Sequence, residues 1–599
     1  MKISIEKTIY ESLTKGLNDL YGFSAPENII QIQKTRPDFE GDFTLVVFPF
    51  LKHSKKSPEQ TAEEIGRFLK DEIAEIEKFN VIKGFLNLSL SQDYWLDFLK
   101  EVVNDDEYGI NQENFGARKM MIEYSSPNTN KPLHLGHIRN NLLGYAVSNI
   151  LKANGHEIKK VNLVNDRGIH ICKSMLAWQK WGEGKTPQSE NQKGDQFVGD
   201  YYVKFDQEYK KQVESLKEQG MDKERALKEA PLIREAQEML HKWEQGDESV
   251  NDLWKRMNNW VLQGFDNTYK RLGVDFDEID YESQTYQLGK EIVLSGLQQG
   301  IFLKKEDGSV WIDLKNEGLD EKLLLRADGT SVYITQDIGT AIMRYRKFPF
   351  KDLIYVVGNE QEYHFKVLAI ILGKLGYDWS KHLYHLSYGM VELPSGKMKS
   401  REGTVVDADD LIDEMVDNAK DMSQQLGKLD EYTKEQKEEI FRIIGLGALK
   451  YFILKVDPKK NMLFDPQESI DFNGNTGPFI QYTYARILSV FRKAREKGIK
   501  FEFSFGNNLD LSDKELNLLK KIYQYPGVVS EAGEELNPSL VANYTYDLVK
   551  QYNQFYQDHP ILKEENKDLL YFRLTLSRMV SNLIYSSMGL LGIEVPERM

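Results

Sequence analysis

The hydrophobic residues in the central part of the chain follow a strand pattern, then a helix pattern, then a strand pattern again. Lys119–Tyr124 is a short, mostly apolar run that predicts a strand. In Leu135–Ala153 the apolar residues recur at helical spacing, and Asn154-Gly155 supplies a helix stop. Lys159–Val164 predicts the next strand. Strand, turn, helix and strand in this order form a βαβ unit, so we expect a parallel sheet.

The rest of the chain divides into regions of different pattern. Strand-like segments resume at Val310–Asp313, Leu353–Val357 and Leu386–Glu392. An insertion at about residues 180–280 contains a stretch rich in Lys, Glu and Gln with few apolar residues, which predicts solvated helices rather than core. The C-terminal part is wholly helical by pattern. Its apolar and aromatic stripe is interpreted as core packing and consists of Leu540, Tyr544, Leu548, Tyr552 and Tyr556.

These patterns predict a multidomain α/β protein. The expected parts are an N-terminal α/β module (1–110), a Rossmann-like parallel-sheet domain (115–408), a helical linker (409–470) and an all-helical C-terminal domain (471–599). A chain of 599 residues has ample material for this many domains.

The composition excludes several classes of protein. No apolar run approaches the ~20 residues of a membrane span, and the N-terminus lacks the pattern of a signal peptide. The single cysteine, Cys172, excludes an intrachain disulfide. Together these features lead us to expect a cytoplasmic protein without a membrane partner.

The net charge of −15 argues against a nucleic-acid partner when the chain is taken as a whole. Binding needs only a local basic face, however, and two basic patches are present. Their main cations are Lys52, Lys55 and Lys56 near the N-terminus, and Arg486, Arg492 and Lys493 in the C-terminal part. A solvated surface is the alternative interpretation of each patch.

The turn before the predicted helix carries the first candidate chemistry. His134 and His137 flank Gly136 where a βα turn would open a phosphate site. A helix N-terminus attracts anions through its unpaired N–H groups and its dipole, and glycine lets a ligand approach the backbone closely. Two loop histidines beside a turn glycine remain the alternative.

Two further groups of residues suggest ligand binding. The loop Ser395–Gly403 has glycines near both ends and three cations, which suit a polyphosphate. Tyr333 and Asp337 lie four apart on one helix face, with Gln361 downstream and Glu123 at the end of the first strand. Carboxylates with a phenol and amides suit a planar cation such as a guanidinium. Taken separately, each group is also explained as a surface loop or cap.

In their order along the chain these segments resemble class I aminoacyl-tRNA synthetases, and among them the arginyl-tRNA synthetases. H-L-G-H and G-K-M-K-S-R resemble the two motifs of the class. The segments that resemble the arginyl family are I-E-Y-S-S-P-N-T-N-K-P-L-H-L-G-H, Y-I-T-Q-D-I-G, V-V-G-N-E-Q-E-Y-H-F and G-N-T-G-P-F-I-Q-Y-T-Y-A-R-I. The N-terminal F-E-G-D-F and G-F-L-N-L resemble the module of that family that contacts the tRNA elbow. The resemblance covers essentially the whole chain.

The resemblance implies roles for individual residues. The implied ATP-binding residues are His134, Gly136, His137, Lys397, Met398, Lys399 and Ser400, in a loop that runs to Arg401. The implied arginine-binding residues are Glu123, Ser125, Asn128, Tyr333, Asp337 and Gln361. The two basic patches gain a tRNA-binding interpretation, and the C-terminal helices resemble an anticodon-binding domain. Mg²⁺ is expected to arrive with ATP, without a metal site of the protein.

One position departs from the class pattern. The usual second motif is K-M-S-K-S, but aligned on Lys397 and Met398 its second lysine is replaced by Ser400, while Lys399 stands one residue early. In many arginyl enzymes a lysine just before the first motif is thought to stand in, and Lys131 has that place. We expect Lys131 first, and Lys399 second, to stabilise the departing pyrophosphate alongside His134, His137 and Lys397.

The implied activity is ligation of arginine to its tRNA through an adenylate, by a protein that we expect to be a monomer. A cysteinyl synthetase or a pantothenate-type ligase would share the two motifs. The first normally needs a cysteine-built zinc site, which one cysteine cannot supply, and the second needs no long helical C-terminal domain. A non-catalytic tRNA-binding relative would be expected to have lost His134, His137 or Lys397, and all three are present.

Overall fold

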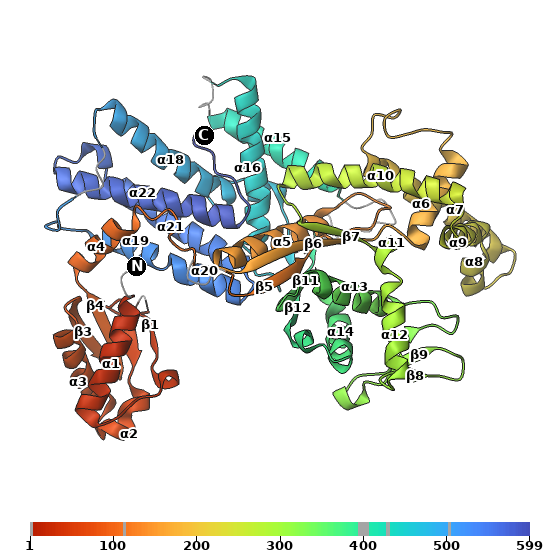
Figure 1. The fold of residues 1–599 in the computed structure, drawn as a ribbon. Coiled ribbons are helices and arrows are strands. Elements are labelled where there is room, and N and C mark those ends of the chain that lie inside the picture. Colours follow the sequence, from red (N-terminus) through yellow and green to blue (C-terminus); the bar gives the residue numbers. More distant parts are fainter. Residues whose placement is uncertain are drawn as a thin grey trace. The chain divides into compact units, whose positions relative to one another are not determined.

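The computed structural model describes residues 4–36, 38–111, 116–392, 394, 406–426, 432–500 and 505–599. The chain forms two compact units, each built from separate stretches of sequence. One comprises Met1–Tyr108, Ile487–Tyr525 and Asp547–Leu583, and the other comprises Gly109–Arg486, Pro526–Tyr546 and Ile584–Met599. Figure 1 shows the elements of both units, coloured along the sequence.

The N-terminal part of the first unit is the α/β module that the sequence predicts. Its antiparallel sheet has the order β1-β2-β4-β3, with β1 Ile32–Lys34, β2 Phe43–Val46, β3 Ile76–Ile82 and β4 Phe85–Leu90. Helices α1 (Ile5–Tyr21) and α3 (Pro58–Glu72) pack against each other, and α3 packs on the sheet. Two shorter helices, α2 (Leu51–Ser54) and α4 (Gln92–Val102), complete the module. Ser57 begins α3 because its side chain accepts a hydrogen bond from the backbone N–H of Gln60, which closes a capping box.

A five-stranded parallel sheet forms the centre of the second unit, as the βαβ pattern predicts. Its strand order is β12-β11-β5-β6-β7. The bounds are β5 Lys119–Glu123, β6 Glu157–Val164, β7 Glu278–Tyr281, β11 Asp352–Gly358 and β12 Leu383–Tyr388. Helix α5, Leu135–Ala153, has the predicted bounds and connects β5 to β6. In the paired register Glu123 lies between Val161 of β6 and Tyr355 of β11.

Three features of the sheet region differ from the sequence prediction. Leu386–Glu392 is not one strand: β12 ends at Tyr388, and Val391–Glu392 forms β13, which pairs with β14 (Met462–Leu463). Val310–Asp313 contains the strand β9, as predicted, but this strand belongs to a separate antiparallel sheet. That sheet comprises β8 Leu303–Lys304, β9 Val310–Ile312 and β10 Lys322–Leu325. The sequence does not predict the edge strand β7, because it has only four residues and because the structure buries Asp280 and exposes Ile279, opposite to the hydrophobic pattern.

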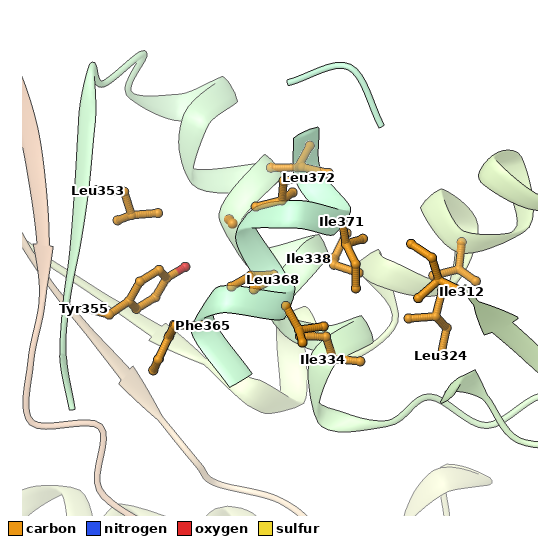
Figure 2. Packing of buried hydrophobic residues seen from close by; sticks show 14 of the residues in the cluster. Ile312, Leu324, Ile334, Ile338, Leu353, Tyr355, Phe365, Leu368, Ile371 and Leu372 are labelled. Carbon is orange, nitrogen blue, oxygen red and sulfur yellow. The ribbon is translucent and has the colours of Figure 1, made fainter. Parts of the chain in front are cut away.

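Helices α12 (Leu288–Gln298), α13 (Tyr333–Lys347) and α14 (Glu362–Lys374) share a hydrophobic core with one side of the parallel sheet and with the small antiparallel sheet. Figure 2 shows this core, in which Ile334 and Ile338 of α13 lie near Leu368, Ile371 and Leu372 of α14. The core fixes α13, whose first two turns carry Tyr333 and Asp337, relative to the strand ends.

The insertion is helical but not merely solvated, contrary to the prediction. Helix α6 (Ile169–Trp181) leads into it, and its own helices are α7 Gly194–Glu218, α8 Lys223–Glu229, α9 Pro231–Glu244 and α10 Glu248–Leu272; the short α11 (Glu282–Thr285) follows β7. Phe197 of α7 and Trp260 and Phe265 of α10 are buried, and the Phe197 and Trp260 rings meet edge to face. Aromatic residues bury 150–250 Å² each, so a few of them are enough to build a small core in a polar sequence.

The remaining helices are α15 Ala408–Leu426, α16 Lys434–Leu454, α17 Pro466–Ser469, α18 Gly477–Glu496, α19 Asp513–Tyr523, α20 Tyr525–Glu534, α21 Pro538–Asp558 and α22 Lys567–Leu590. Tyr544, Leu548 and Tyr552 of the predicted stripe are buried on α21, which confirms core packing. Within the described ranges, no helix is both long enough and apolar enough to cross a membrane.

Candidate functional site

The chain turns sharply where β5 ends, at the carboxyl edge of the parallel sheet. Ser125 and Ser126 have φ values of 77° and 45°, in the left-handed region that non-glycine residues rarely adopt. The Ser125 N–H donates to Oδ1 of Asn140 at 2.5 Å, and the Ser126 N–H donates to Oδ1 of Asn162 at 3.0 Å. These side-chain acceptors, from α5 and β6, replace the ladder partners that the turn gives up and hold its unusual conformation.

The next residues run alongside the end of β6. Asn128 forms a parallel bridge with Asn165, the Asn165 N–H donates to the Pro127 carbonyl at 2.9 Å, and the Thr129 N–H donates to the Asn165 carbonyl at 2.9 Å. Asn128 is therefore fixed beside the carboxyl ends of β5 and β6. Ligands of open α/β sheets bind at this edge, so its position agrees with the predicted ligand role.

The two histidines of the turn cap helix α5 and fix each other. The Gly136 N–H donates to Nδ1 of His134 at 3.1 Å, and the His134 N–H donates to Nδ1 of His137 at 3.2 Å. A ring nitrogen that accepts a hydrogen bond carries no proton, so in the neutral form each imidazole has its proton on Nε2. The helix N-terminus thus presents two Nε2–H donors to a ligand.

Both histidines are neutral at physiological pH. Burial, with the nearby Lys131 ammonium, lowers the pKa of His134 to about 4, and burial, with His134 and Lys131, holds the pKa of His137 well below its usual range. Lys131 is therefore close enough to act electrostatically on both rings. Within the described part of the turn, Lys131 is the residue that brings a positive charge, and the histidines bring hydrogen bonds.

The second motif lies outside the described residues, including Lys397, Met398, Lys399, Ser400 and Arg401. The structure describes the residues that follow it. Asp407 forms an antiparallel bridge with His134, and the Ala408 N–H donates to the Leu133 carbonyl at 2.9 Å. The chain after the second motif thus returns to the first motif.

The predicted cation-binding residues lie on α13 and at the carboxyl end of β11. Tyr333 is the first residue of α13 and is 69% exposed. Asp337, one turn later, accepts a hydrogen bond from Nε2 of His364 at 2.6 Å. Gln361 is exposed at the end of the 3-10 turn Asn359–Gln361, which follows β11. His364 was not among the predicted site residues, although it stands three residues after Gln361.

A further acidic residue, Glu282, lies close enough to Asp337 for the two carboxylates to repel each other, and the sequence does not predict it as a site residue. Burial first, and then the carboxylates of Asp337, Asp166 and Glu123, together raise its pKa to about 8, although the Arg167 guanidinium opposes this shift. Asp166 lies in the connection between β6 and α6, and it accepts hydrogen bonds from the backbone N–H and the hydroxyl of Ser283. Several carboxylates that repel one another in a partly buried site favour a cationic ligand.

Glu123 already has an internal guanidinium partner. Arg344 of α13 donates to Oε2 of Glu123 and, through Nε, to Oδ2 of Asp280 at 2.8 Å. The other oxygen, Oε1 of Glu123, accepts a hydrogen bond from the Ser126 hydroxyl at 3.1 Å. Arg344 is almost completely buried, and although burial opposes its charge, Glu123 and Asp280 raise its pKa. The Arg344 guanidinium thus neutralises two of the carboxylates near the site, those of Glu123 and Asp280.

The predicted N-terminal basic patch is exposed, whereas Arg486 and Arg492 of the C-terminal patch are half-buried. Lys52, Lys55 and Lys56 are exposed around the end of α2, and Lys56 also pairs with Glu64. Arg486 lies over the ring of Tyr482, with its guanidinium carbon 4.8 Å from the centroid, and Lys493 is exposed further along α18. Among the described residues, His, Cys, Asp and Glu side chains form no group of three that could hold a metal ion.

Comparison with known proteins agrees with this geometry. The parallel sheet, whose first crossover helix begins at a histidine-capped turn, lies within a match to the catalytic domain of class I aminoacyl-tRNA synthetases, so the chain is a member of that class. The family model "tRNA synthetases class I (R), catalytic domain" matches residues 99–465, "DALR anticodon binding domain" matches 480–599 and "Arginyl tRNA synthetase N terminal domain" matches 7–90. The chain belongs to the arginyl-tRNA synthetase family.

Individual relatives extend the agreement over the full length. The arginine–tRNA ligases of Bacteroides thetaiotaomicron and Bacteroides fragilis are 60% and 61% identical to the chain over 597 residues, and all of each chain is covered. The arginyl-tRNA synthetase structure of Thermus thermophilus has a TM-score of 0.80 at 24% identity over all of both chains. The Plasmodium falciparum structure has a TM-score of 0.74 at 20% identity over 99% of both. At these identities the two structures support the fold alone.

Proposed function

We propose that the carboxyl edge of the parallel sheet binds arginine and ATP side by side and joins them. The chain is an arginine–tRNA ligase of class I. In the first step a carboxylate oxygen of arginine attacks the α-phosphorus of ATP, and the bond to the β-phosphate oxygen breaks, which releases pyrophosphate. In the second step the 2′-hydroxyl oxygen of the terminal tRNA adenosine attacks the arginyl carbonyl, AMP leaves and the hydroxyl proton is released.

The grouped carboxylates carry the arginine assignment. We propose that Asp337 and Glu282 receive the guanidinium, with Tyr333 and Gln361 beside them and with Ser125 and Asn128 toward the amino-acid head group. Glu123 remains part of the proposed site, where it contributes negative charge and is held in place by Arg344. The pKa of Glu282, raised to about 8, is the supporting observation, because it marks a site that is stabilised when a cation enters it.

The histidine turn carries the ATP assignment. We propose that His134 and His137 donate their Nε2–H groups to phosphate oxygens, and that Gly136 lets the nucleotide approach the start of α5. Preorganised donors at a helix N-terminus stabilise developing charge without rearranging during the reaction. Lys131 would supply the positive charge beside the departing pyrophosphate. The proposed roles of Lys397, Met398, Lys399 and Ser400 concern residues that the structure does not describe.

We propose that Mg²⁺ reaches the site with the ATP phosphates. The described residues offer no three-ligand group of their own for it, and ATP-bound Mg²⁺ commonly keeps several waters and few protein ligands. Its chemistry would be to neutralise phosphate charge. For tRNA, we propose contacts through Lys52, Lys55 and Lys56 on the N-terminal module (1–110) and through Arg486, Arg492 and Lys493 in the helical C-terminal domain (471–599).

The decisive experiment is ATP–pyrophosphate exchange with each of the twenty amino acids, with and without tRNA. We expect exchange with arginine only. Exchange with another amino acid at a comparable rate would contradict the proposed arginine site. Exchange that appears only when tRNA is added would show that tRNA binding completes the site.

A further inference from the structure

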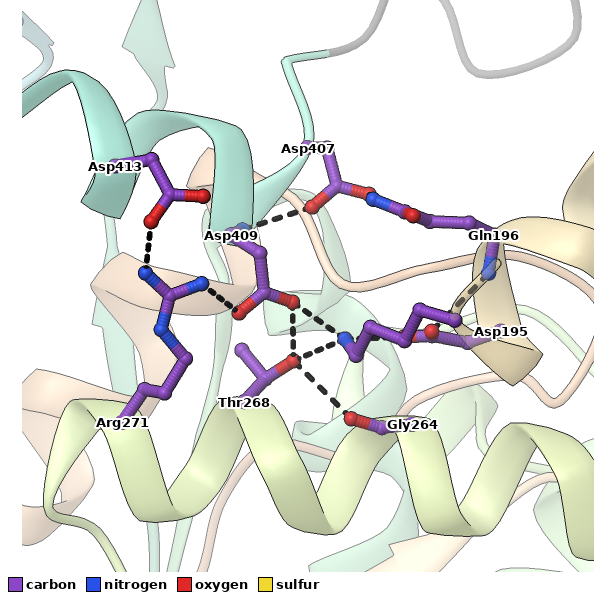
Figure 3. A network of polar contacts seen from close by, with 9 residues as sticks. Asp195, Gln196, Gly264, Thr268, Arg271, Asp407, Asp409 and Asp413 are labelled. Carbon is purple, nitrogen blue, oxygen red and sulfur yellow. Dashed lines mark hydrogen bonds and ion pairs between the residues drawn. The ribbon is translucent and has the colours of Figure 1, made fainter. Parts of the chain in front are cut away.

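The beginning of α7 lies beside the proposed ATP site although it belongs to the helical insertion. We call residues 193–199 the α7 root. The Lys193 ammonium donates to Oδ2 of Asp195 at 2.9 Å, to Oγ1 of Thr268 at 2.6 Å and to Oδ2 of Asp409. Figure 3 shows Asp409 between the helix that carries Thr268 and Arg271 and the segment that carries Asp195 and Gln196. One buried cluster thus joins α7, α10 and the start of α15.

This cluster reaches the first motif through Asp407. Oδ2 of Asp407 accepts from Nε2 of Gln196 at 3.2 Å, and its Oδ1 accepts from the Asp409 N–H at 2.8 Å (Figure 3). The backbone of Asp407 bridges to His134, and the next residue, Ala408, donates to Leu133. A single residue, Asp407, therefore connects Gln196 of the insertion to the histidine that caps α5.

A second contact joins the α7 root directly to Lys131 and Pro132. Gly199 has no side chain at this point, and a Cβ placed there would lie 2.9 Å from Cδ of Pro132 and 3.6 Å from Cα of Lys131. Real Cβ atoms essentially never approach a heavy atom within 3.0 Å, so even an alanine would displace the segment that precedes His134. The α7 root thus contacts the turn directly at Pro132 and reaches His134 through Asp407.

We propose that the α7 root is a positioning element for the ATP-binding turn, in which Lys193 and Gly199 set the location of Lys131 and His134. The inference rests on the proposed function, because it needs the turn to bind ATP. The insertion, which the sequence presents as a solvated appendage, then forms a supporting wall of the nucleotide site. A displacement of about 1 Å at a reacting group can cost on the order of 10²-fold in rate, so this support has a measurable consequence.

Gly199→Ala separates positioning from folding. Alanine has a helix propensity about 1 kcal/mol better than glycine, so the substitution favours α7 itself while it pushes against Pro132. We expect kcat/KM for ATP in arginine-dependent exchange to fall on the order of 10²-fold, with the KM for arginine changed less than twofold and the melting temperature retained. The matched control is Gly527→Ala, at an exposed helical glycine of α20 whose added Cβ would meet no atom within 4 Å.

A second variant tests the ion pairs that Lys193 of the α7 root forms with Asp195 and Asp409. Lys193→Met alone would leave Asp195 and Asp409 buried without their shared cation, so Lys193→Met is combined with Asp195→Asn to remove a charge from each side. We expect the same selective loss for ATP. If both variants keep wild-type ATP kinetics, or lose ATP and arginine kinetics equally, the inference is wrong.

Calorimetric titration with Mg²⁺-ATP distinguishes failure of the inference from failure of the proposed function. A wild-type protein that binds ATP but shows no arginine-dependent exchange would contradict the proposed function. The inference would then be decided by the ATP affinities alone: it requires Gly199→Ala to weaken ATP binding at least tenfold relative to Gly527→Ala, and equal affinities would overturn it.

Discussion

His364 holds the carboxylate of Asp337 through a hydrogen bond of 2.6 Å from Nε2 to Oδ2. Asp337 lies on α13 and His364 on α14, and the shared hydrophobic core holds these two helices against each other. A carboxylate that is held in place can accept paired hydrogen bonds from a guanidinium and attract its charge. A mobile carboxylate must first lose conformational freedom before it can do so.

We therefore predict that His364→Ala raises the KM for arginine by about tenfold, since a hydrogen bond to a charged group contributes about 1.5–3 kcal/mol. The value of kcat should change less, because His364 acts on Asp337 rather than on the reacting carboxylate. Steady-state exchange kinetics measure both constants. His241→Ala, at an exposed histidine of α9, is the control. A loss confined to kcat would contradict the positioning role.

Arginine binding should depend on pH through Glu282. With its pKa raised to about 8 in the empty site, Glu282 is mostly protonated at pH 7, whereas a bound guanidinium favours the ionised form. Affinity for arginine should therefore increase as the pH rises, by about fivefold from pH 7 to pH 8, and level off above. Calorimetry in buffers of different ionisation enthalpy should detect proton release on binding. Glu282→Gln should abolish both effects, and their persistence in that variant would assign them to another group.

Lys131 is expected to act on the transition state. Its charge lowers the pKa of both His134 and His137, so it lies near the two residues that we propose bind the phosphates. Lys131→Ala should lower kcat by on the order of 10²-fold or more, with a smaller change in the KM for ATP. Single-turnover formation of the adenylate is the direct measurement. A change in KM alone would show that Lys131 contributes only to ground-state binding.

Arg344 is predicted to be essential for the stability of the catalytic unit. Arg344→Met leaves Glu123 and Asp280 buried without their cation, and breaking a buried ion pair from one side costs about 3–5 kcal/mol. We expect a clearly lower melting temperature, read by circular dichroism. Arg346→Met, two residues along the same helix at an exposed position, should melt as the wild type does. Equal melting temperatures would mean that the two carboxylates are neutralised in another way.

The sequence was most informative where function depends on neighbouring residues. The bounds of α5, the placement of His134 and His137 at its start and the spacing of Tyr333 and Asp337 all follow from local periodicity, because a helix end and a helix face are defined within a few residues. Family resemblance then extended these local patterns to the reaction and the substrates.

Local pattern failed where a role depends on residues that are far apart in the chain. Arg344 meets Glu123 across 221 positions, and Gln196 meets Asp407 across 211. Glu282 has no motif of its own. Its raised pKa exists only because folding removes it from water and brings Asp337, Asp166 and Glu123 close to it.

The sequence by itself thus determined most elements of the central sheet, since backbone periodicity and capping are short-range, and its resemblance to the arginyl family indicated the reaction class. Only the tertiary structure decided which carboxylates remain for a cationic substrate and which are already neutralised by Arg344, since desolvation and Coulomb interactions depend on distances in space. The contacts of the helical insertion with the histidine turn, on which its proposed supporting role rests, likewise appear only in the tertiary structure.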